Sequence, residues 1–128
     1  MTIRAIDHIN IATTKLEETR AFYVDVLGLT EGDRPPFDFA GHWLYAGGFP
    51  IVHMQLSPRD VTSSTLSGLN HAAFQVADLD ALIARLDAAG VRYTTLLVPG
   101  TTIRQAFFMD PNGVRLELNE ARHVKGLD

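Results

Sequence analysis

Two histidines and a glutamate stand at repeated places in the chain and could together bind a metal ion. His8 lies in DHINIAT and His71 lies in NHAAFQV, and their positions differ by 71 − 8 = 63. Leu16 and Leu79 keep this offset, and for the glycines that follow, Gly28 and Gly90, it is 90 − 28 = 62. A repeat of this length is a whole supersecondary unit, and two copies place equivalent residues around one axis. The spacing therefore predicts that His8 and His71 serve one site.

Glu117 is the natural third member of this site. It lies between Leu116 and Leu118 in an expected strand, where a carboxylate is costly unless it is paired or bound to a metal. A single strand histidine is more often an ordinary core or surface residue, but the joint pattern favours ligation. Two imidazoles and a carboxylate suit a divalent transition metal, namely zinc, iron, manganese, nickel or cobalt. These residues predict a site without choosing among the metals.

A fourth ligand is expected near the end of the first repeat. Carrying the offset of the two glycines forward makes Gln55 the counterpart of Glu117, because 55 + 62 = 117. His53 comes shortly before Gln55, one full pleat earlier, so an extended strand points it to the same face. Imidazole is a better ligand for these metals than an amide oxygen, and we therefore predict His53 as the fourth ligand. The alternatives are that Gln55 ligates instead of His53, or that both residues line the pocket and neither ligates.

The same offset predicts the surroundings of a substrate. It matches Trp43 with Gln105 and Tyr45 with Phe107, which gives the cleft an aromatic wall. Arg104 and Gln105 alternate in a strand, so only one of them can face inward; an arginine would hold a carboxylate or phosphate, and a glutamine would hydrogen-bond it. The predicted substrate-binding residues are Gln55, Trp43, Tyr45, Gln105 and Arg104.

Composition narrows the class of partner. The chain has 128 residues, 46% of them hydrophobic, which is enough to bury the core of a single domain. A net charge of −4 does not favour binding to nucleic acid or to an anionic membrane surface, because both are negatively charged. The absence of cysteine excludes thiolate ligands and thiol nucleophiles. No signal peptide or membrane span is evident. We expect a cytoplasmic protein with a small-molecule substrate.

Hydrophobic periodicity and turn residues predict the same order of elements in both halves. We expect a strand, a helix ended by glycine and then three strands, twice, which makes an α+β fold of two tandem βαβββ units with curved mixed sheets around a central metal-binding cleft. Thr14 and Glu17 suggest a capping box for the first helix, and Asp78 a cap for the second. The expected boundaries are 4–56 for the first unit, 57–68 for a linker and 69–120 for the second unit, within one domain of residues 1–128. The expected strands are 6–12, 37–39, 43–46, 51–56, 72–76, 92–97, 104–109 and 114–118, and the expected helices are 14–27 and 78–89.

The segments that carry this pattern resemble one superfamily. They are DHINIAT, AFYVDVLGL, FDFAGHWLY, IVHMQL, NHAAFQV and RQAFFMDPNGVRLEL. The chain resembles the vicinal oxygen chelate superfamily, which includes glyoxalase I, bleomycin-resistance proteins and extradiol dioxygenases, and most resembles its small glyoxalase-like proteins. The resemblance implies a divalent metal held by residues from the first and last strands of each unit, and it implies a homodimer. In glyoxalase I the place of Gln55 is a metal-binding glutamate, so the amide departs from that pattern.

The expected activity follows from the metal and from Glu117. A bound metal ion would polarise neighbouring substrate oxygens, and Glu117 would be the catalytic base as well as a ligand. This favours a glyoxalase-type isomerase or lyase acting on a small substrate that chelates the metal. One alternative is an iron(II) dioxygenase of extradiol type, which would need only His8, His71 and Glu117. The other is a metal-free protein that binds a small molecule or drug.

Overall fold

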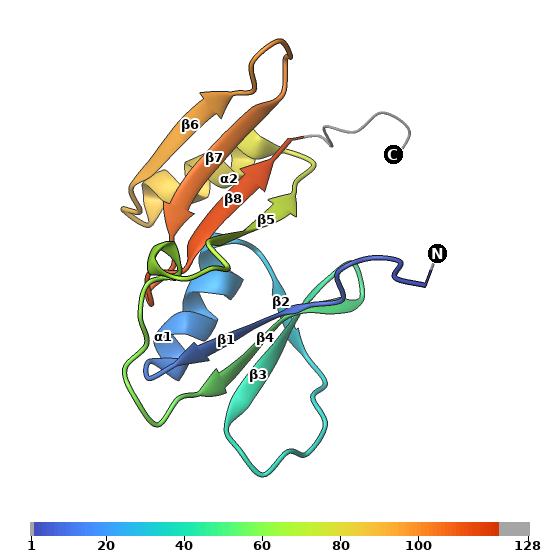
Figure 1. Ribbon diagram of the computed structural model, residues 1–128, viewed down its shortest axis with the longest axis vertical. Coiled ribbons are helices and arrows are strands. Elements are labelled where there is room, and N and C mark those ends of the chain that lie inside the picture. Colours follow the sequence, from blue (N-terminus) through green and yellow to red (C-terminus); the bar gives the residue numbers. More distant parts are fainter. Residues whose placement is uncertain (1, 121–128) are drawn as a thin grey trace. The chain divides into compact units, whose positions relative to one another are not determined.

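A computed structural model describes residues 2–120 of the chain; residue 1 and residues 121–128 lie outside the described part. The chain divides into two compact units, the first ending at Val61 and the second beginning at Thr62. Each unit has the order strand, helix and three strands (Figure 1). The predicted α+β class with two βαβββ units is therefore confirmed.

The first unit is a four-stranded mixed sheet with one helix. The sheet order is β1-β4-β3-β2, with β1 parallel to β4 and the other neighbours antiparallel. Helix α1 continues directly into a π-helical segment and contacts β4. The bounds are β1 Ile9–Thr13, α1 Leu16–Ala21, π-helix Phe22–Val26, β2 Thr30–Gly32, β3 Gly41–Ala46 and β4 Phe49–Leu56.

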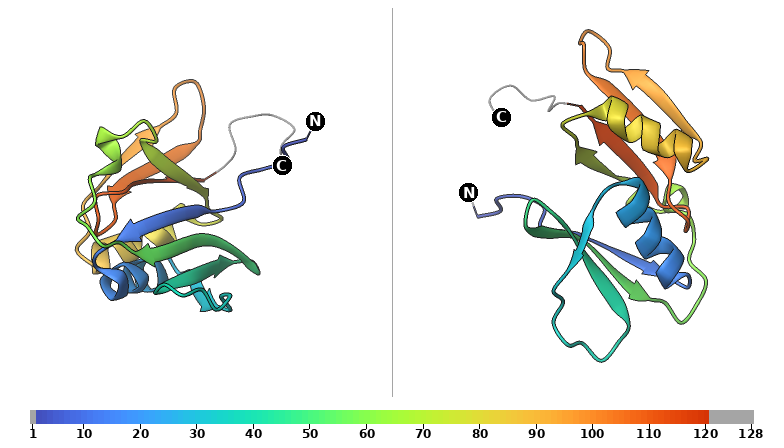
Figure 2. Two further views of the ribbon diagram at one scale, coloured as in Figure 1. Left: turned by 60° about the horizontal axis from the view of Figure 1, so that its bottom comes forward. Right: turned by 180° about the vertical axis from the view of Figure 1, so that it is seen from behind.

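The second unit repeats this topology with the sheet order β5-β8-β7-β6. Again the first strand, β5, is parallel to the last, β8. Helix α2 lies against one face of this sheet and contacts β7 (Figure 2). A short 3-10 helix, Ser64–Leu66, lies in the stretch expected as linker. The other bounds are β5 His71–Gln75, α2 Leu79–Ala88, β6 Tyr93–Leu97, β7 Arg104–Met109 and β8 Arg115–Asn119.

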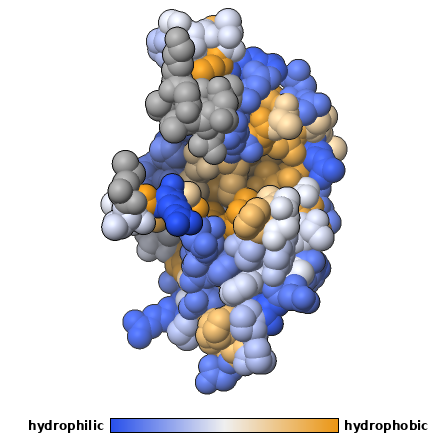
Figure 3. Space-filling model, turned by 90° about the vertical axis from the view of Figure 1, so that its right-hand side faces the viewer, coloured by the Kyte–Doolittle hydropathy of each residue, from blue (hydrophilic) through white to orange (hydrophobic). Residues whose placement is uncertain are grey.

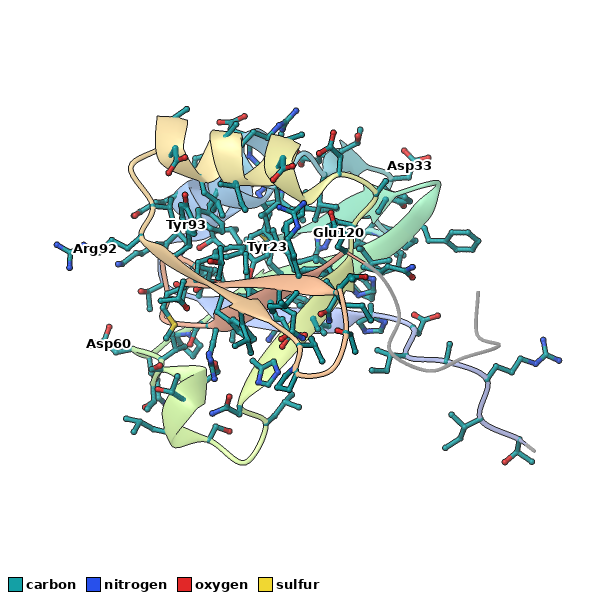
Figure 4. All side chains as sticks on the ribbon, turned by 90° about the horizontal axis from the view of Figure 1, so that it is seen from above. Tyr23, Asp33, Asp60, Arg92, Tyr93 and Glu120 are labelled. Atoms are coloured by element: carbon teal, nitrogen blue, oxygen red, sulfur yellow. The ribbon has the colours of Figure 1, made fainter. Side chains whose placement is uncertain are left out.

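Strand alternation divides core residues from site residues. Along β4, Val52 and Met54 are fully buried, whereas His53 and Gln55 on the other face are only partly buried. A period of two along a strand produces this division, since successive side chains point to opposite faces. Tyr23 of the π-helical segment is also fully buried (Figure 4). One face of the first sheet is therefore part of the core, and the other face carries the polar side chains of the candidate site.

The helix ends agree with the sequence except at the start of α1. Gly28 and Gly90 have φ values of 77° and 69°, which end the helices as predicted. The Asp78 side chain accepts a hydrogen bond of 3.0 Å from the Ala81 backbone N–H and caps α2. The predicted Thr14 capping box is wrong, because α1 begins later, after Lys15, and the N–H of Lys15 is bound by the Thr13 hydroxyl at 2.9 Å.

One expected strand, residues 37–39, is also wrong. This segment belongs to the irregular connection between β2 and β3, where the Phe37 N–H donates to the Pro35 carbonyl at 2.8 Å. The consecutive prolines Pro35 and Pro36 prevent a ladder from starting here, since proline has no N–H to donate. The strand that completes the sheet, β2, instead follows Gly28 almost at once. Within residues 2–120, no helix is long and apolar enough to cross a membrane.

Candidate metal centre

The second unit brings His71 and Glu117 together. His71 is the first residue of β5, and Glu117 lies in β8, opposite Ala73. The His71 Nε2 atom lies 3.5 Å from a Glu117 carboxylate oxygen. Glu117 is 8% exposed, so its charge is largely removed from water. An imidazole nitrogen and a carboxylate oxygen on one sheet face are two suitable metal ligands.

A chain of amides orients the Glu117 carboxylate. The Asn119 side-chain amide donates to the second carboxylate oxygen of Glu117. The Gln105 amide in turn donates to the Asn119 side-chain oxygen at 2.7 Å. Such supporting hydrogen bonds fix the direction of a metal-binding carboxylate. Gln105, predicted as a substrate-binding residue, lies on the Glu117 face and is engaged in this network.

The first unit brings His8 and His53 together in an aromatic stack. Their rings are parallel within 13°, with centroids 3.7 Å apart. The indole of Trp43 stacks on the other face of His53, with centroids 4.0 Å apart. Within the described part of the chain, the buried Nε2 atom of His53 has no hydrogen-bond partner. A buried polar atom without a partner is costly, and a metal ion would satisfy this nitrogen.

The environment of His53 favours its neutral form. Burial lowers the pKa of His53 below its ordinary value, and the charge of nearby His8 lowers it further. A backbone hydrogen bond to Pro50 and the charge of Asp7 act in the opposite direction, but the net shift is downward. A metal ligand must be a neutral imidazole, so His53 is in the form that can ligate at neutral pH.

The residue directly before His8 and the residue directly before His71 fix the two imidazole rings. Asp7 Oδ2 lies 2.7 Å from His8 Nδ1, and Asn70 Oδ1 lies 2.9 Å from His71 Nδ1. A hydrogen bond at Nδ1 leaves Nε2 as the nitrogen available for a metal. Each repeat thus carries a histidine together with the acceptor that orients it. The supporting role of Asp7 and Asn70 was not predicted from the sequence.

Strand register defines the surroundings of His53 in the first sheet. His53 lies opposite Asn10 of β1 and opposite Trp43 of β3. His8 lies two residues before Asn10, just outside β1, and its ring stacks on that of His53, so it lies on the same face. His8, His53 and Trp43 therefore form one group on this face.

The same places in the second sheet are held by His71 and Glu117. Glu117 lies opposite Ala73 of β5 and Phe107 of β7. His71 precedes Ala73 by one full pleat, as His8 precedes Asn10. The structural counterpart of Glu117 is therefore His53, and the two units present a His8–His53 pair and a His71–Glu117 pair at equivalent positions.

This register corrects the equivalences taken from sequence spacing. The counterparts His53 and Glu117 are 117 − 53 = 64 positions apart. At this offset Gln55 corresponds to Asn119, and Trp43 corresponds to Phe107, because 55 + 64 = 119 and 43 + 64 = 107. The predicted matches of Gln55 with Glu117, Trp43 with Gln105 and Tyr45 with Phe107 are wrong.

A pair of backbone hydrogen bonds confirms the corrected register. The Leu56 N–H donates to the Ala40 carbonyl, and the Glu120 N–H donates to the Arg104 carbonyl. The two donors and the two acceptors are related by the same offset, because 120 − 56 = 64 and 104 − 40 = 64. The last strands of the two units therefore correspond at this offset through their ends.

Arg104 lies on the other face of its sheet from Glu117. Its guanidinium pairs with Asp80 of α2 at 2.9 Å and with Glu120 at 2.7 Å. These two carboxylates raise the pKa of Arg104 further above its ordinary value. Strand alternation separates Arg104 from Gln105, so Gln105 is the member of the two that lies on the Glu117 face.

A pocket of about 150 Å³ opens on the site face of the first unit. Gln55 lines it and accepts a hydrogen bond of 2.9 Å from the Asn10 side-chain amide. Tyr45, also predicted here, is not a lining residue; its hydroxyl donates to the Asp33 carbonyl. The lining residues are His8, Asn10, Arg34, Phe37, Phe39, Trp43, His53, Met54 and Gln55.

The potential metal ligands of the described residues lie as pairs and not as larger groups. Among residues 2–120, no group of three or more His, Asp or Glu side chains could hold a metal ion. The structure instead shows two pairs of potential ligands, one in each unit, each with its own supporting hydrogen bonds. Asp7, Asn70 and Asn119 are the supporting residues that sequence reasoning missed. A polar residue directly before each repeated histidine was the signal for the first two.

The fold and the two pairs of potential ligands define a class of protein built from two βαβββ repeats with histidine and carboxylate side chains on the sheet faces. The family model of the Glyoxalase/Bleomycin resistance protein/Dioxygenase superfamily matches residues 5–118. The chain belongs to this superfamily, which contains metal-dependent enzymes.

Three similar proteins support this placement. The uncharacterised protein YaeR of Escherichia coli (strain K12) is 33% identical over 125 residues, covering 92% of this chain and 97% of YaeR. Glyoxylase I 4 of Arabidopsis thaliana is 28% identical over 123 residues, covering 91% of this chain and 70% of that protein. A solved structure, the putative glyoxalase family protein from Bacillus anthracis, has a TM-score of 0.80 at 25% identity, covering 95% of this chain and 98% of that one.

Proposed function

We propose that the protein is a divalent-metal-dependent isomerase or lyase of glyoxalase type, and that His8, His53, His71 and Glu117 are its metal ligands. The observation that carries this proposal is the equivalence of the His8–His53 pair and the His71–Glu117 pair in strand register. The unpartnered Nε2 of His53 and the Nδ1 anchors of His8 and His71 support the same assignment. Zinc, iron, manganese, nickel and cobalt all suit this donor set.

Four protein ligands favour isomerase or lyase chemistry over the iron dioxygenase. An oxygenase centre with two histidines and one carboxylate keeps several coordination positions open, whereas a fourth ligand leaves fewer of them. When bound, the metal would act as a Lewis acid toward two neighbouring substrate oxygens. The substrate class is therefore a small molecule that carries vicinal oxygen atoms.

The residues of the chain supply the proton transfer and the positioning. Glu117, held by Asn119, is the proposed base that removes a proton from the carbon next to the polarised carbonyl. Returning this proton to the adjacent carbon completes an isomerisation. Trp43 and Phe107 occupy equivalent positions beside the two ligand pairs, where their rings would exclude water from the substrate.

Deuterium exchange tests this activity. Protein loaded with each metal in turn is incubated in D₂O with the hemithioacetal of methylglyoxal and glutathione, and with simple α-hydroxy ketones, and is followed by NMR. We expect metal-dependent exchange at the carbon next to the carbonyl, abolished by a chelator. Failure to exchange with every metal and substrate would count against the isomerase, and oxygen uptake with catechol and iron(II) would establish the dioxygenase instead.

We further propose that the protein forms a homodimer. Several large apolar side chains of the described residues are exposed, and apolar patches lie among polar ones on the surface in Figure 3; such patches mark association sites when they are contiguous. The exposed residues include Ile6, Phe49, Leu66, Leu69 and Leu97. Light scattering at micromolar concentration should give twice the mass of the chain, and a monomer mass would refute the dimer.

A further inference from the structure

Arg34 brings a positive charge to the pocket of the first unit. It belongs to the connection between β2 and β3 and lines the pocket together with His8, His53 and Trp43. From the sequence alone, Arg34 of the proline-rich loop could gate a pocket, although a solvated loop arginine is the more common case.

Two aromatic rings and a backbone carbonyl hold this side chain in place. The guanidinium carbon lies 5.0 Å from the ring centroid of Phe37 and 5.0 Å from that of Phe39. One terminal nitrogen, Nη2, donates to the Phe39 carbonyl at 2.9 Å. Contacts between an arginine and aromatic faces are attractive and restrict the guanidinium. The side chain is therefore positioned before any ligand arrives.

Gly41 makes room for this arrangement. A Cβ atom added at Gly41 would lie 2.9 Å from Arg34 Nη2 and 2.2 Å from the Met54 carbonyl oxygen. Gly41 is opposite Gln55 in the sheet. The absence of a side chain at this position lets the guanidinium lie against the strand, at the edge of the pocket.

Within residues 2–120, Arg34 has no carboxylate partner. Its neighbours in the loop, Asp33 and Asp38, are exposed and form no ion pair with it, although Arg20 and Arg104 are both paired. A half-buried guanidinium without an ion-pair partner costs free energy, and its planar donors match the oxygen atoms of carboxylate or phosphate.

We propose that Arg34 is the anion-binding residue of the substrate pocket, so that the substrate carries a carboxylate or phosphate group in addition to its metal-chelating oxygens. The part of this inference that concerns the substrate rests on the proposed function. The binding of an anion at Arg34 does not, because the guanidinium and its supports all belong to the first unit.

The first experiment uses metal-free protein. Trp43 is the only tryptophan of the chain and lines the same pocket as Arg34, so its fluorescence reports on occupancy. Acetate and inorganic phosphate are titrated separately, and the tighter of the two identifies the preferred oxyanion. We expect saturable binding that Arg34→Gln weakens by about 10- to 100-fold, the scale of a charge-assisted hydrogen bond. Arg34→Lys keeps the positive charge but loses the planar guanidinium, so its anion affinity should lie between those of the unmodified protein and Arg34→Gln.

The second experiment uses manganese-loaded protein and two matched chelators. Glycolate and tartronate both chelate through a hydroxyl and a carboxylate, but tartronate carries one more carboxylate. Calorimetry should show tartronate binding at least about 10-fold more tightly, and Arg34→Gln should remove this preference. Arg59→Gln is the control, since it removes an exposed arginine of the same unit and should leave both affinities unchanged.

The outcomes separate this inference from the proposed function. If Arg34→Gln binds acetate, phosphate and tartronate like the unmodified protein, the inference is overturned whether or not a metal binds. If the protein binds no metal but the metal-free titration depends on Arg34, the proposed function fails and the anion site stands. Thermal unfolding of each variant checks that its fold is intact.

Discussion

Replacing Glu117 by alanine should reduce the affinity for a divalent metal more than about 100-fold. Loss of a supporting group alone typically costs about 10- to 100-fold, and Glu117 is the only carboxylate among the proposed ligands. Its carboxylate is nearly buried and lies 3.5 Å from His71, so a metal ion bound by both residues would lose its only anionic ligand. Calorimetric titration with zinc or nickel measures the loss.

The fold of this variant should survive. A buried carboxylate that loses its metal is itself unfavourable, so removing it from the metal-free protein should not lower the free energy of unfolding greatly. Glu18→Ala is a matched control, because Glu18 is an exposed acid on α1. Metal bound with unchanged affinity by a folded Glu117→Ala protein would rule out Glu117 as a ligand.

His53→Ala should also weaken metal binding strongly, by at least about 10- to 100-fold, whereas Gln55→Ala should change it little. The reason is positional: His53 is the register counterpart of Glu117, while Gln55 corresponds to Asn119 and is bound by Asn10. Both side chains lie on one face of β4, one pleat apart, so each variant is the control for the other.

The opposite ranking would have a clear meaning. A large loss in Gln55→Ala with little change in His53→Ala would place the amide in the metal site, as the spacing of the two halves first suggested. No loss in either variant would leave His8, His71 and Glu117 as a three-ligand site and would bring the dioxygenase forward. Metal titration of the two purified variants, side by side, distinguishes these cases.

Periodicity and turn chemistry were sufficient to predict most of the fold. Alternation along β4, the glycines that end both helices and the turn after β7 all have local causes. In that turn the Asp110 side chain accepts from the Asn112 and Val114 N–H groups at 2.7 and 2.9 Å, and Gly113 has a φ of 77°. Local signals of this kind do not depend on how distant strands pair.

The register of the second half could not be predicted in this way. Gly32 pairs with Trp43, and Thr94 pairs with Phe107, so the hairpin is longer in the second unit, where 107 − 94 = 13, than in the first, where 43 − 32 = 11. An offset measured at the helices therefore drifts by two by the time it reaches the last strands. An even drift preserves the face of each side chain, which is why the candidate ligands were found although their equivalences were wrong.

The contacts that support the candidate ligands could not be predicted from the sequence for a different reason. The hydrogen bond from Asn119 to Glu117 and the stack of His8, His53 and Trp43 join residues whose proximity depends on strand pairing. Arg34 is the extreme case, since its place depends on two phenylalanines and a glycine of an irregular loop and the strand that follows it.

The metal content of the purified protein tests the central claim most directly. Protein expressed and purified without affinity metals or chelators is measured by elemental analysis, and the metal-free form is then titrated with manganese, iron(II), cobalt, nickel and zinc. The proposed site predicts about one divalent transition metal ion per chain. A protein that contains no such metal and binds none of the five in titration would contradict the account.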